Sequence, residues 1–182
     1  MDSALISRYV VALTGVYGMA TNDDIEAGRV WYPMARGDCY DAAIRYDFSI
    51  KRACFAAAAL SNNMEWSHNV ALLEHVMFAV RNGTEPHGHY APCLRKAVAI
   101  LGHGDYSALS GPKVVPFAHA LLGDTRAAVI DRWMYRAAAE SGWQTERRAR
   151  NIAVALRVVA KDVKRSVSET QAIIWTAIRR GV

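Results

Sequence analysis

Apolar residues recur at intervals of three and four along almost the whole chain, which is the spacing of one face of an α-helix. The stripe formed by Trp66, Val70, Leu73, Val76 and Met77 is one clear case. β-Branched residues rarely alternate with polar ones, so strands are not expected. We therefore predict an all-α protein, a compact bundle of about nine or ten helices that forms a single domain over residues 1–182.

Polar clusters and glycines predict where these helices begin and end. The acidic cluster at residues 21–24 and the Ser166-x-x-Glu169 capping box are typical of helix N-termini. Gly37, Gly102 and Gly142 are predicted to end helices. The alanine-rich segment 49–60 is expected to be central, because small side chains let neighbouring helices approach. The predicted helices cover residues 4–19, 24–36, 39–46, 49–60, 65–80, 92–101, 113–122, 129–141, 145–164 and the segment after 166.

The basic residues are concentrated near the C-terminus. Residues 132–182 hold 11 of the 22 Lys and Arg residues but only four of the 17 acidic ones, a net charge of +7. The rest of the chain has a net charge of −2. This asymmetry favours an anionic partner, of which nucleic acid is the commonest, although a solvated basic helix face would give the same pattern.

Several classes of protein are not expected. The three cysteines, Cys39, Cys54 and Cys93, lack CxxC spacing, which argues against a disulfide framework, a four-cysteine zinc site or an iron–sulfur cluster, and fits a reducing compartment. The loop histidines have no Cys or Glu at ligand spacing, so no metal or other cofactor is predicted. No apolar run of membrane-spanning length and no signal peptide is recognised. We expect a cytoplasmic protein, in a bacterial or phage-infected host cell, without membrane contact or an obligate protein partner.

Three short motifs stand out between residues 50 and 140. Ser61-Asn62-Asn63 follows the alanine-rich helix, Gly111-Pro112-Lys113 lies between two predicted helices, and Val129-Ile130-Asp131 comes 18 residues after the lysine. A glycine at a tight turn lets backbone N–H groups approach a phosphate, and the following helix N-terminus favours an anion. A deprotonated lysine amine can attack a sugar carbon, and a carboxylate can stabilise positive charge on that sugar.

In this order, the motifs resemble those of the helix–hairpin–helix DNA glycosylase superfamily, which includes endonuclease III and 8-oxoguanine glycosylase. The chain resembles a short, divergent member of a phage-like type, with the helix–hairpin–helix at about residues 92–122. It departs from the family pattern at Leu109, where the first hairpin glycine would stand, and at Trp133, where a histidine is common. The resemblance implies double-stranded DNA as the partner and a target base that leaves the helix.

The resemblance also implies roles for individual residues. Lys113 would be the nucleophile and Asp131 the assisting carboxylate. Asn62 and Asn63 would fill the space left by the flipped base, and Ser110 and Gly111 would hold a phosphate at the hairpin. By their charge and their position after Asp131, the expected phosphate contacts are Arg132, Arg136, Arg147 and Arg148. Independently of the resemblance, two tryptophans, Trp66 and Trp133, are candidates for a base pocket, because aromatic rings stack on bases.

The sequence leaves more than one function open. The first is a DNA glycosylase with lyase activity in DNA repair, and a variant is a transferase that uses the same pocket for base hypermodification, as in some phages. The second is a DNA-binding module without chemistry. Each motif also has a purely structural explanation: Lys113 would be a solvated lysine, Asp131 a helix N-cap, and Asn62 and Asn63 a turn that ends a helix. The third possibility is then a helical structural protein whose basic face has no partner.

Overall fold

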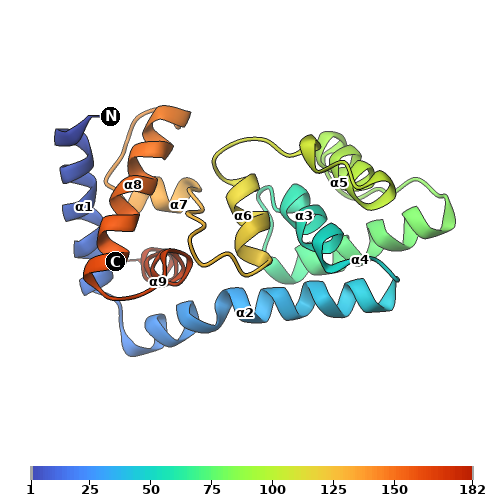
Figure 1. Cartoon of the computed structure of the whole chain (residues 1–182), viewed down its shortest axis with the longest axis horizontal. Coiled ribbons are helices and arrows are strands. Elements are labelled where there is room, and N and C mark those ends of the chain that lie inside the picture. The colour runs from blue at the N-terminus through green and yellow to red at the C-terminus, as the bar shows by residue number, and fades with distance from the viewer. Residues whose placement is uncertain (1, 182) are drawn as a thin grey trace. The chain divides into compact units, whose positions relative to one another are not determined.

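The computed structural model describes residues 2–181, and over these residues it is all-α, as the sequence predicts (Figure 1). Nine α-helices and one short 3₁₀ helix, η1, make up the described part of the chain. They are α1 (Ser3–Gly18), α2 (Asn22–Arg45), α3 (Ile50–Leu60), α4 (Trp66–Asn82), α5 (Ala91–His103), η1 (Tyr106–Ala108), α6 (Val114–Leu121), α7 (Arg132–Ala137), α8 (Glu146–Asp162) and α9 (Val167–Arg180).

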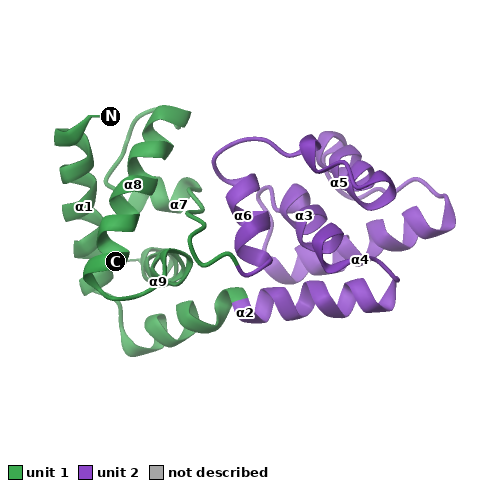
Figure 2. Cartoon of the chain, in the orientation of Figure 1, with its two compact units in different colours: residues 1–32, 124–182 green, residues 33–123 purple. Residues whose placement is uncertain are grey.

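The chain divides into two compact units (Figure 2). Unit 1 comprises Met1–Tyr32 and Asp124–Val182, and unit 2 comprises Pro33–Gly123. Helix α2 contributes its first turns to unit 1 and the rest to unit 2, so the chain passes between the units twice. The single domain expected from the sequence stays a prediction.

Unit 1 is built from α1, α7, α8, α9 and the first turns of α2. Helix α1 packs along α8, and α9 contacts α1, α7 and α8 (Figure 1). Their shared core contains fully buried large side chains from each of the four helices, among them Tyr9, Met134, Leu156 and Ile174. Side-chain caps begin α8 and α9. The hydroxyl of Thr145 accepts the N–H of Arg148, and the hydroxyl of Ser166 accepts the N–H of Glu169.

Unit 2 surrounds α3, which packs against α4, α5 and α6. Eight of the eleven α3 residues are buried, and five of these are alanines. Small side chains allow this close approach on several sides, so the predicted central position of the segment 49–60 is confirmed. The core of the unit is completed by Leu73, Met77, Ile100, Leu101 and Leu121, all of them essentially inaccessible to solvent.

The structure corrects the prediction that Gly37 ends a helix. Helix α2 continues through Pro33 and Gly37 to Arg45, joining the predicted segments 24–36 and 39–46. A glycine within a helix costs only about 1 kcal/mol relative to alanine, and it ends a helix only when its backbone turns left-handed. Gly37 keeps a negative φ, whereas Gly83 and Gly104, which do end α4 and α5, have φ of 65° and 69°.

Two further boundaries differ from the prediction. Helix α5 passes Gly102 and ends at Gly104. Helix α7 is much shorter than the predicted 129–141, because the Asp131 side chain caps it and Ala139, with φ of 53°, follows its end. The residues before Asp131 are therefore a buried, non-helical connector instead of a first helical turn.

Neither a single membrane-spanning helix nor a cluster of metal-binding side chains occurs among the described residues. No single helix there has the length and apolar character needed to cross a membrane; only α1 and α2 taken together meet the criterion, and they are bent by 109° at their break. Residues 2–181 contain no group of three or more His, Cys, Asp or Glu side chains arranged to hold a metal ion.

Candidate functional site

Lys113 lies at the N-cap position of α6 in unit 2, where its side chain is half-buried. Its Nζ donates a hydrogen bond of 2.9 Å to the backbone oxygen of Ser61, a residue 52 positions away in the chain. A neutral amine keeps its lone pair while donating one N–H. This bond is therefore compatible with nucleophilic attack by the amine.

The turn after α3 carries the two predicted asparagines beside this lysine. Asn62 and Asn63 are exposed, and they directly follow Ser61, which accepts the Lys113 bond. Asn63 has φ of 52°, a left-handed conformation that asparagine adopts more readily than most residues. The turn thus has a structural use for Asn63, while Asn62 projects from it without a conformational requirement of this kind.

The segment between α5 and α6 has the helix–turn–helix order expected from the sequence. Ser110 and Gly111 are exposed, and Gly111 has φ of 96°, which favours glycine. Leu109 is extended, with φ of −83°, so the backbone there does not need the glycine of the family pattern. Both α5 and α6 pack on α3. That α5 and α6 form a helix–hairpin–helix that binds DNA stays a prediction.

Asp131 is the N-cap of α7 in unit 1. Its Oδ1 accepts the backbone N–H groups of Trp133 and Met134, both at 3.0 Å, and its Oδ2 accepts the indole N–H of Trp175 at 3.1 Å. The carboxylate is half-buried and also contributes, after burial itself, to raising the pKa of the Tyr32 hydroxyl. The Asp131 carboxylate can therefore cap α7 and can also stabilise a nearby positive charge.

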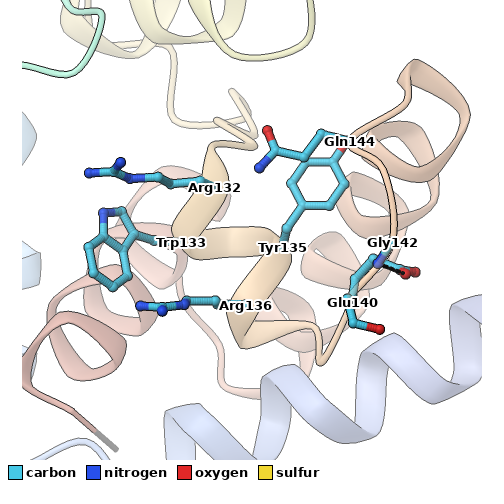
Figure 3. Close-up of a pocket in the computed structure, with 8 residues that line it drawn as sticks. Arg132, Trp133, Tyr135, Arg136, Glu140, Gly142 and Gln144 are labelled. Carbon is cyan, nitrogen blue, oxygen red and sulfur yellow. Dashed lines mark hydrogen bonds between the residues drawn. The ribbon is translucent and has the colours of Figure 1, made fainter.

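Trp133 is surrounded by arginines. The guanidinium carbons of Arg132, Arg136 and Arg179 lie 5.5, 5.0 and 5.9 Å from the centre of its ring. Arg132 and Arg136 extend on either side of the indole in Figure 3. Such distances are typical of cation–π contacts. The first turn of α7 therefore combines an aromatic ring with concentrated positive charge.

Arg132, Trp133 and Arg136 also help to line a pocket of about 490 Å³ (Figure 3). The opposite wall comes from the segment after α7 and includes Gly142 and Gln144. Neither Arg132 nor Arg136 has an ion pair or hydrogen bond to another residue in the described chain, and both are exposed. These guanidinium groups are therefore available to an anion.

The two other predicted arginines differ from each other. Arg147 is exposed in the first turn of α8. Arg148 instead donates to the backbone oxygen of Trp143 at 3.0 Å and lies 3.6 Å from Glu140. Its present contacts hold the loop at residues 138–145 together, and a contact with DNA stays a prediction for both arginines.

Within each unit, the structure brings part of the predicted site together. Unit 2 places Lys113 beside the turn that carries Asn62 and Asn63, and unit 1 places Asp131 beside Trp133 and its arginines. Trp66 lies in unit 2, where its indole donates to Asp38 at 2.7 Å. The pairing of Lys113 with Asp131, and of Trp66 with Trp133, stays a prediction.

Three residues of this region were not predicted from the sequence. Trp175 bonds Asp131, and the Arg179 guanidinium lies 4.5 Å from the centre of the Trp175 ring. Both come from α9, more than 40 positions after Asp131, and only the tertiary packing of unit 1 shows their role. Trp143 is 89% exposed in the loop after α7, and its neighbours Gly142 and Gln144 line the pocket. The sequence carries no signal for Trp143, because its exposure follows from the bonds that hold the loop.

Comparison with other proteins gives a family but no function. No curated protein and no solved structure matches this chain. One family model, described as a family of unknown function (DUF7178), matches residues 1–182. The chain therefore belongs to the DUF7178 family.

Proposed function

We propose that the protein binds DNA and acts on a base that has left the double helix, with Lys113 as the nucleophile and Asp131 as the assisting carboxylate. The observation that carries the proposal is the hydrogen bond from Lys113 Nζ to Ser61 O. It joins two of the three motifs on which the resemblance to DNA glycosylases depends. A flipped base and the residue that replaces it in the stack belong to the same nucleotide position, so their protein partners must be neighbours.

The chemistry would be displacement at the sugar C1′. The bond that forms joins Lys113 Nζ to C1′, and the bond that breaks is the glycosidic bond, whose electron pair leaves with the base. The departing base takes up a proton from solvent, and the attacking nitrogen loses one, which permits ring opening to a Schiff base. The Asp131 carboxylate would stabilise positive charge that develops on the sugar.

The basic character of α7 supports DNA as the partner. Arg132 directly follows Asp131, and Arg136 lies one helical turn further along α7; neither has an acidic partner in residues 2–181. Guanidinium groups bind phosphates, and these contacts position a protein on DNA without reading sequence. The function requires such a grip as well as the reactive amine.

A second candidate is a DNA-binding module without chemistry. It is favoured by the three N–H groups that Asp131 accepts, which give this residue a structural role in capping α7 and fixing Trp175. Under this alternative, Lys113 would only fasten the turn at Ser61. The base-modifying transferase differs from the glycosylase in its product, so the same experiment distinguishes all three.

The test uses duplexes that contain uracil, 8-oxoguanine, 5-hydroxymethyluracil or only unmodified bases. The protein is incubated with each duplex with and without borohydride, and strands, covalent adducts and nucleoside masses are analysed. A glycosylase is expected to give abasic sites and a trapped adduct, whereas a transferase gives a heavier nucleoside in an intact strand. DNA binding without either product would contradict the enzyme and favour the binding module.

Matched variants assign the roles. Lys113→Ala should abolish the adduct, whereas Lys96→Ala, which removes another half-buried lysine of unit 2, should retain it. Asp131→Asn keeps an oxygen that can cap α7 but removes the charge. We expect it to lower the reaction rate at least about 100-fold, in the range of other electrostatic catalytic groups. The unfolding midpoint should fall slightly, because the amide nitrogen of asparagine cannot accept the Trp175 indole N–H. Full activity of Lys113→Ala would overturn the proposal.

A further inference from the structure

The loop at residues 138–145 presents an isolated tryptophan to solvent. Trp143 is 89% exposed, the highest value among the large hydrophobic residues of the described chain. Exposing a whole indole forgoes the favourable burial of a large apolar surface. An indole held in this way is suited to a partner that covers it.

The loop that carries Trp143 is held by specific interactions. Glu140, whose side chain is only 7% exposed, accepts the Gly142 N–H at 3.0 Å and the Tyr9 hydroxyl. Arg148 donates to the Trp143 carbonyl at 3.0 Å, which ties the start of α8 to the tip of the loop. A Cβ at Gly142 would lie 2.0 Å from the Arg148 guanidinium, so glycine leaves room for this bond.

Of Trp143, only the backbone oxygen takes part in these hydrogen bonds, and the indole ring is exposed to solvent. The loop is fixed to α1 through Tyr9 and to α8 through Arg148. Its indole therefore projects from an ordered support instead of a free chain. A binding residue presented in this way loses less conformational entropy when a ligand covers it.

The same loop faces positive charge. Gly142 and Gln144, on either side of Trp143, line the pocket of Figure 3 together with Arg132 and Arg136. These arginines are four positions apart on α7, a spacing that places them on one helix face. Neither has an acidic partner in the described residues. Trp143 lines a second hollow, which shares Gly142 and Gln144 with this pocket. The indole and the two unneutralised guanidinium groups therefore border two adjoining hollows of one surface.

We propose that this surface binds unpaired nucleotides of a DNA strand, with Trp143 stacked on a base and Arg132 and Arg136 in contact with the strand's phosphates. Every base offers a flat π-face, and stacking on an aromatic side chain combined with backbone neutralisation is how proteins hold single strands. In a paired duplex those faces are already stacked on one another. The inference rests on the proposed function for its choice of DNA as partner, but it is independent of the chemistry of Lys113.

Charge decides between this partner and an apolar one. A hydrophobic protein surface or the interior of a lipid layer would cover Trp143 but would also bury two guanidinium groups that pair with no carboxylate in the described residues, which is costly. A nucleic-acid strand supplies the base and the phosphates together. The two adjoining hollows together therefore fit a strand better than they fit an apolar partner.

The test compares a labelled single-stranded oligonucleotide with its blunt duplex, using fluorescence anisotropy. Trp143→Ala is expected to weaken single-strand binding by about 5- to 150-fold, the range for the loss of one stacked base, and to change duplex affinity less than about twofold. Trp143→Phe should retain most of the affinity, because it keeps an aromatic face. Val158→Ala, which truncates another exposed apolar side chain of unit 1, is the matched control and should bind normally.

The outcomes separate this inference from the proposed function. Equal single-strand affinity of Trp143→Ala and the unmodified chain would overturn the inference, even if the Lys113 adduct forms. Binding to vesicles of anionic phospholipid that depends on Trp143, with single-strand binding unaffected, would also overturn it. Failure of both DNA forms to bind at low salt would refute both proposals. Because Trp143 contributes only its backbone to the loop bonds, Trp143→Ala should fold normally, as circular dichroism would show.

Discussion

At the scale of single residues, neighbouring arginines in this chain have different tasks. Arg147 and Arg148 were predicted together as DNA contacts, and Arg147 is exposed. Arg148 has a side chain only 30% exposed, and it bonds the Trp143 carbonyl and lies near Glu140. Residue type and net charge cannot distinguish the two, because the distinction depends on which face of α8 meets the loop.

Glu140 is the residue whose loss should disturb this arrangement most. The Tyr9 hydroxyl is the largest influence that lowers its pKa; burial opposes this, and the Gly142 N–H and Arg148 lower it further. Glu140→Gln removes the charge that these donors surround. We expect the free energy of unfolding to fall by about 1–3 kcal/mol at pH 7, the usual cost for a buried hydrogen-bonded charge, measured by urea denaturation.

The same carboxylate makes stability depend on pH. Its pKa in the folded protein lies below the unfolded value of about 4.3, so its contribution is present above that value and is lost as the pH falls through the folded pKa. The decrease in the free energy of unfolding at acidic pH should therefore be smaller for Glu140→Gln than for the unmodified chain. Glu26→Gln is the control: its side chain is 61% exposed, and it should change stability little. Identical acid profiles for the unmodified chain and Glu140→Gln would contradict the assignment.

At the scale of elements, one glycine contact fixes how closely two helices of unit 1 approach. A Cβ at Gly28 of α2 would lie 2.5 Å from the backbone nitrogen of Ile173 in α9. Gly28→Ala must push the helices apart, and we expect it to destabilise the fold by about 1–3 kcal/mol, the typical cost of overpacking.

Gly37→Ala is the matched control in the same helix. A Cβ there meets no atom within 4 Å, so only the helix propensity changes. We expect this variant to be more stable by about 0.5–1 kcal/mol. Thermal unfolding followed by circular dichroism gives both differences. Opposite signs for the two variants support the close packing of α2 on α9, and a stable Gly28→Ala protein would refute it.

The elements show how far the sequence predicts this fold. Periodicity, capping residues and the alanine-rich segment predicted all-α structure and the central position of α3, because these features act within one or two helical turns. The predicted end of a helix at Gly37 was wrong, because a glycine ends a helix only when its backbone adopts the left-handed conformation. The short length of α7 was also missed: the predicted helix covered 129–141, although the N-cap role of Asp131, which the structure shows, was one of the alternatives.

The candidate site divides in the same way. Lys113 at the start of α6 and Asp131 at the start of α7 follow from local pattern. The bond from Lys113 to Ser61 and that from Trp175 to Asp131 connect residues 52 and 44 positions apart. Such contacts arise from packing within each unit, and no single helix period encodes them. Trp143 was missed because its exposure depends on the loop bonds beneath it.

At the scale of the whole molecule, the positive charge is unevenly divided. Unit 1 carries 14 Lys and Arg residues against 10 acidic ones, and unit 2 carries eight against seven. Unit 1 also contains Arg132 and Arg136, for which the described residues provide no acidic partner. Electrostatic attraction of a polyanion would therefore act mainly on unit 1.

The salt dependence of DNA binding tests whether position or total charge matters. Each phosphate contact on a single strand contributes about 0.7 to the slope of log affinity against log salt concentration. If Arg132 and Arg136 each contact a phosphate, the double variant that carries Arg132→Ala and Arg136→Ala should have a slope smaller by about 1.4. Arg157→Ala with Lys161→Ala removes the same charge from exposed positions on α8 and should leave the slope nearly unchanged. Equal reductions for both pairs would mean that unit 1 attracts the strand through its net charge alone, without a defined contact at α7.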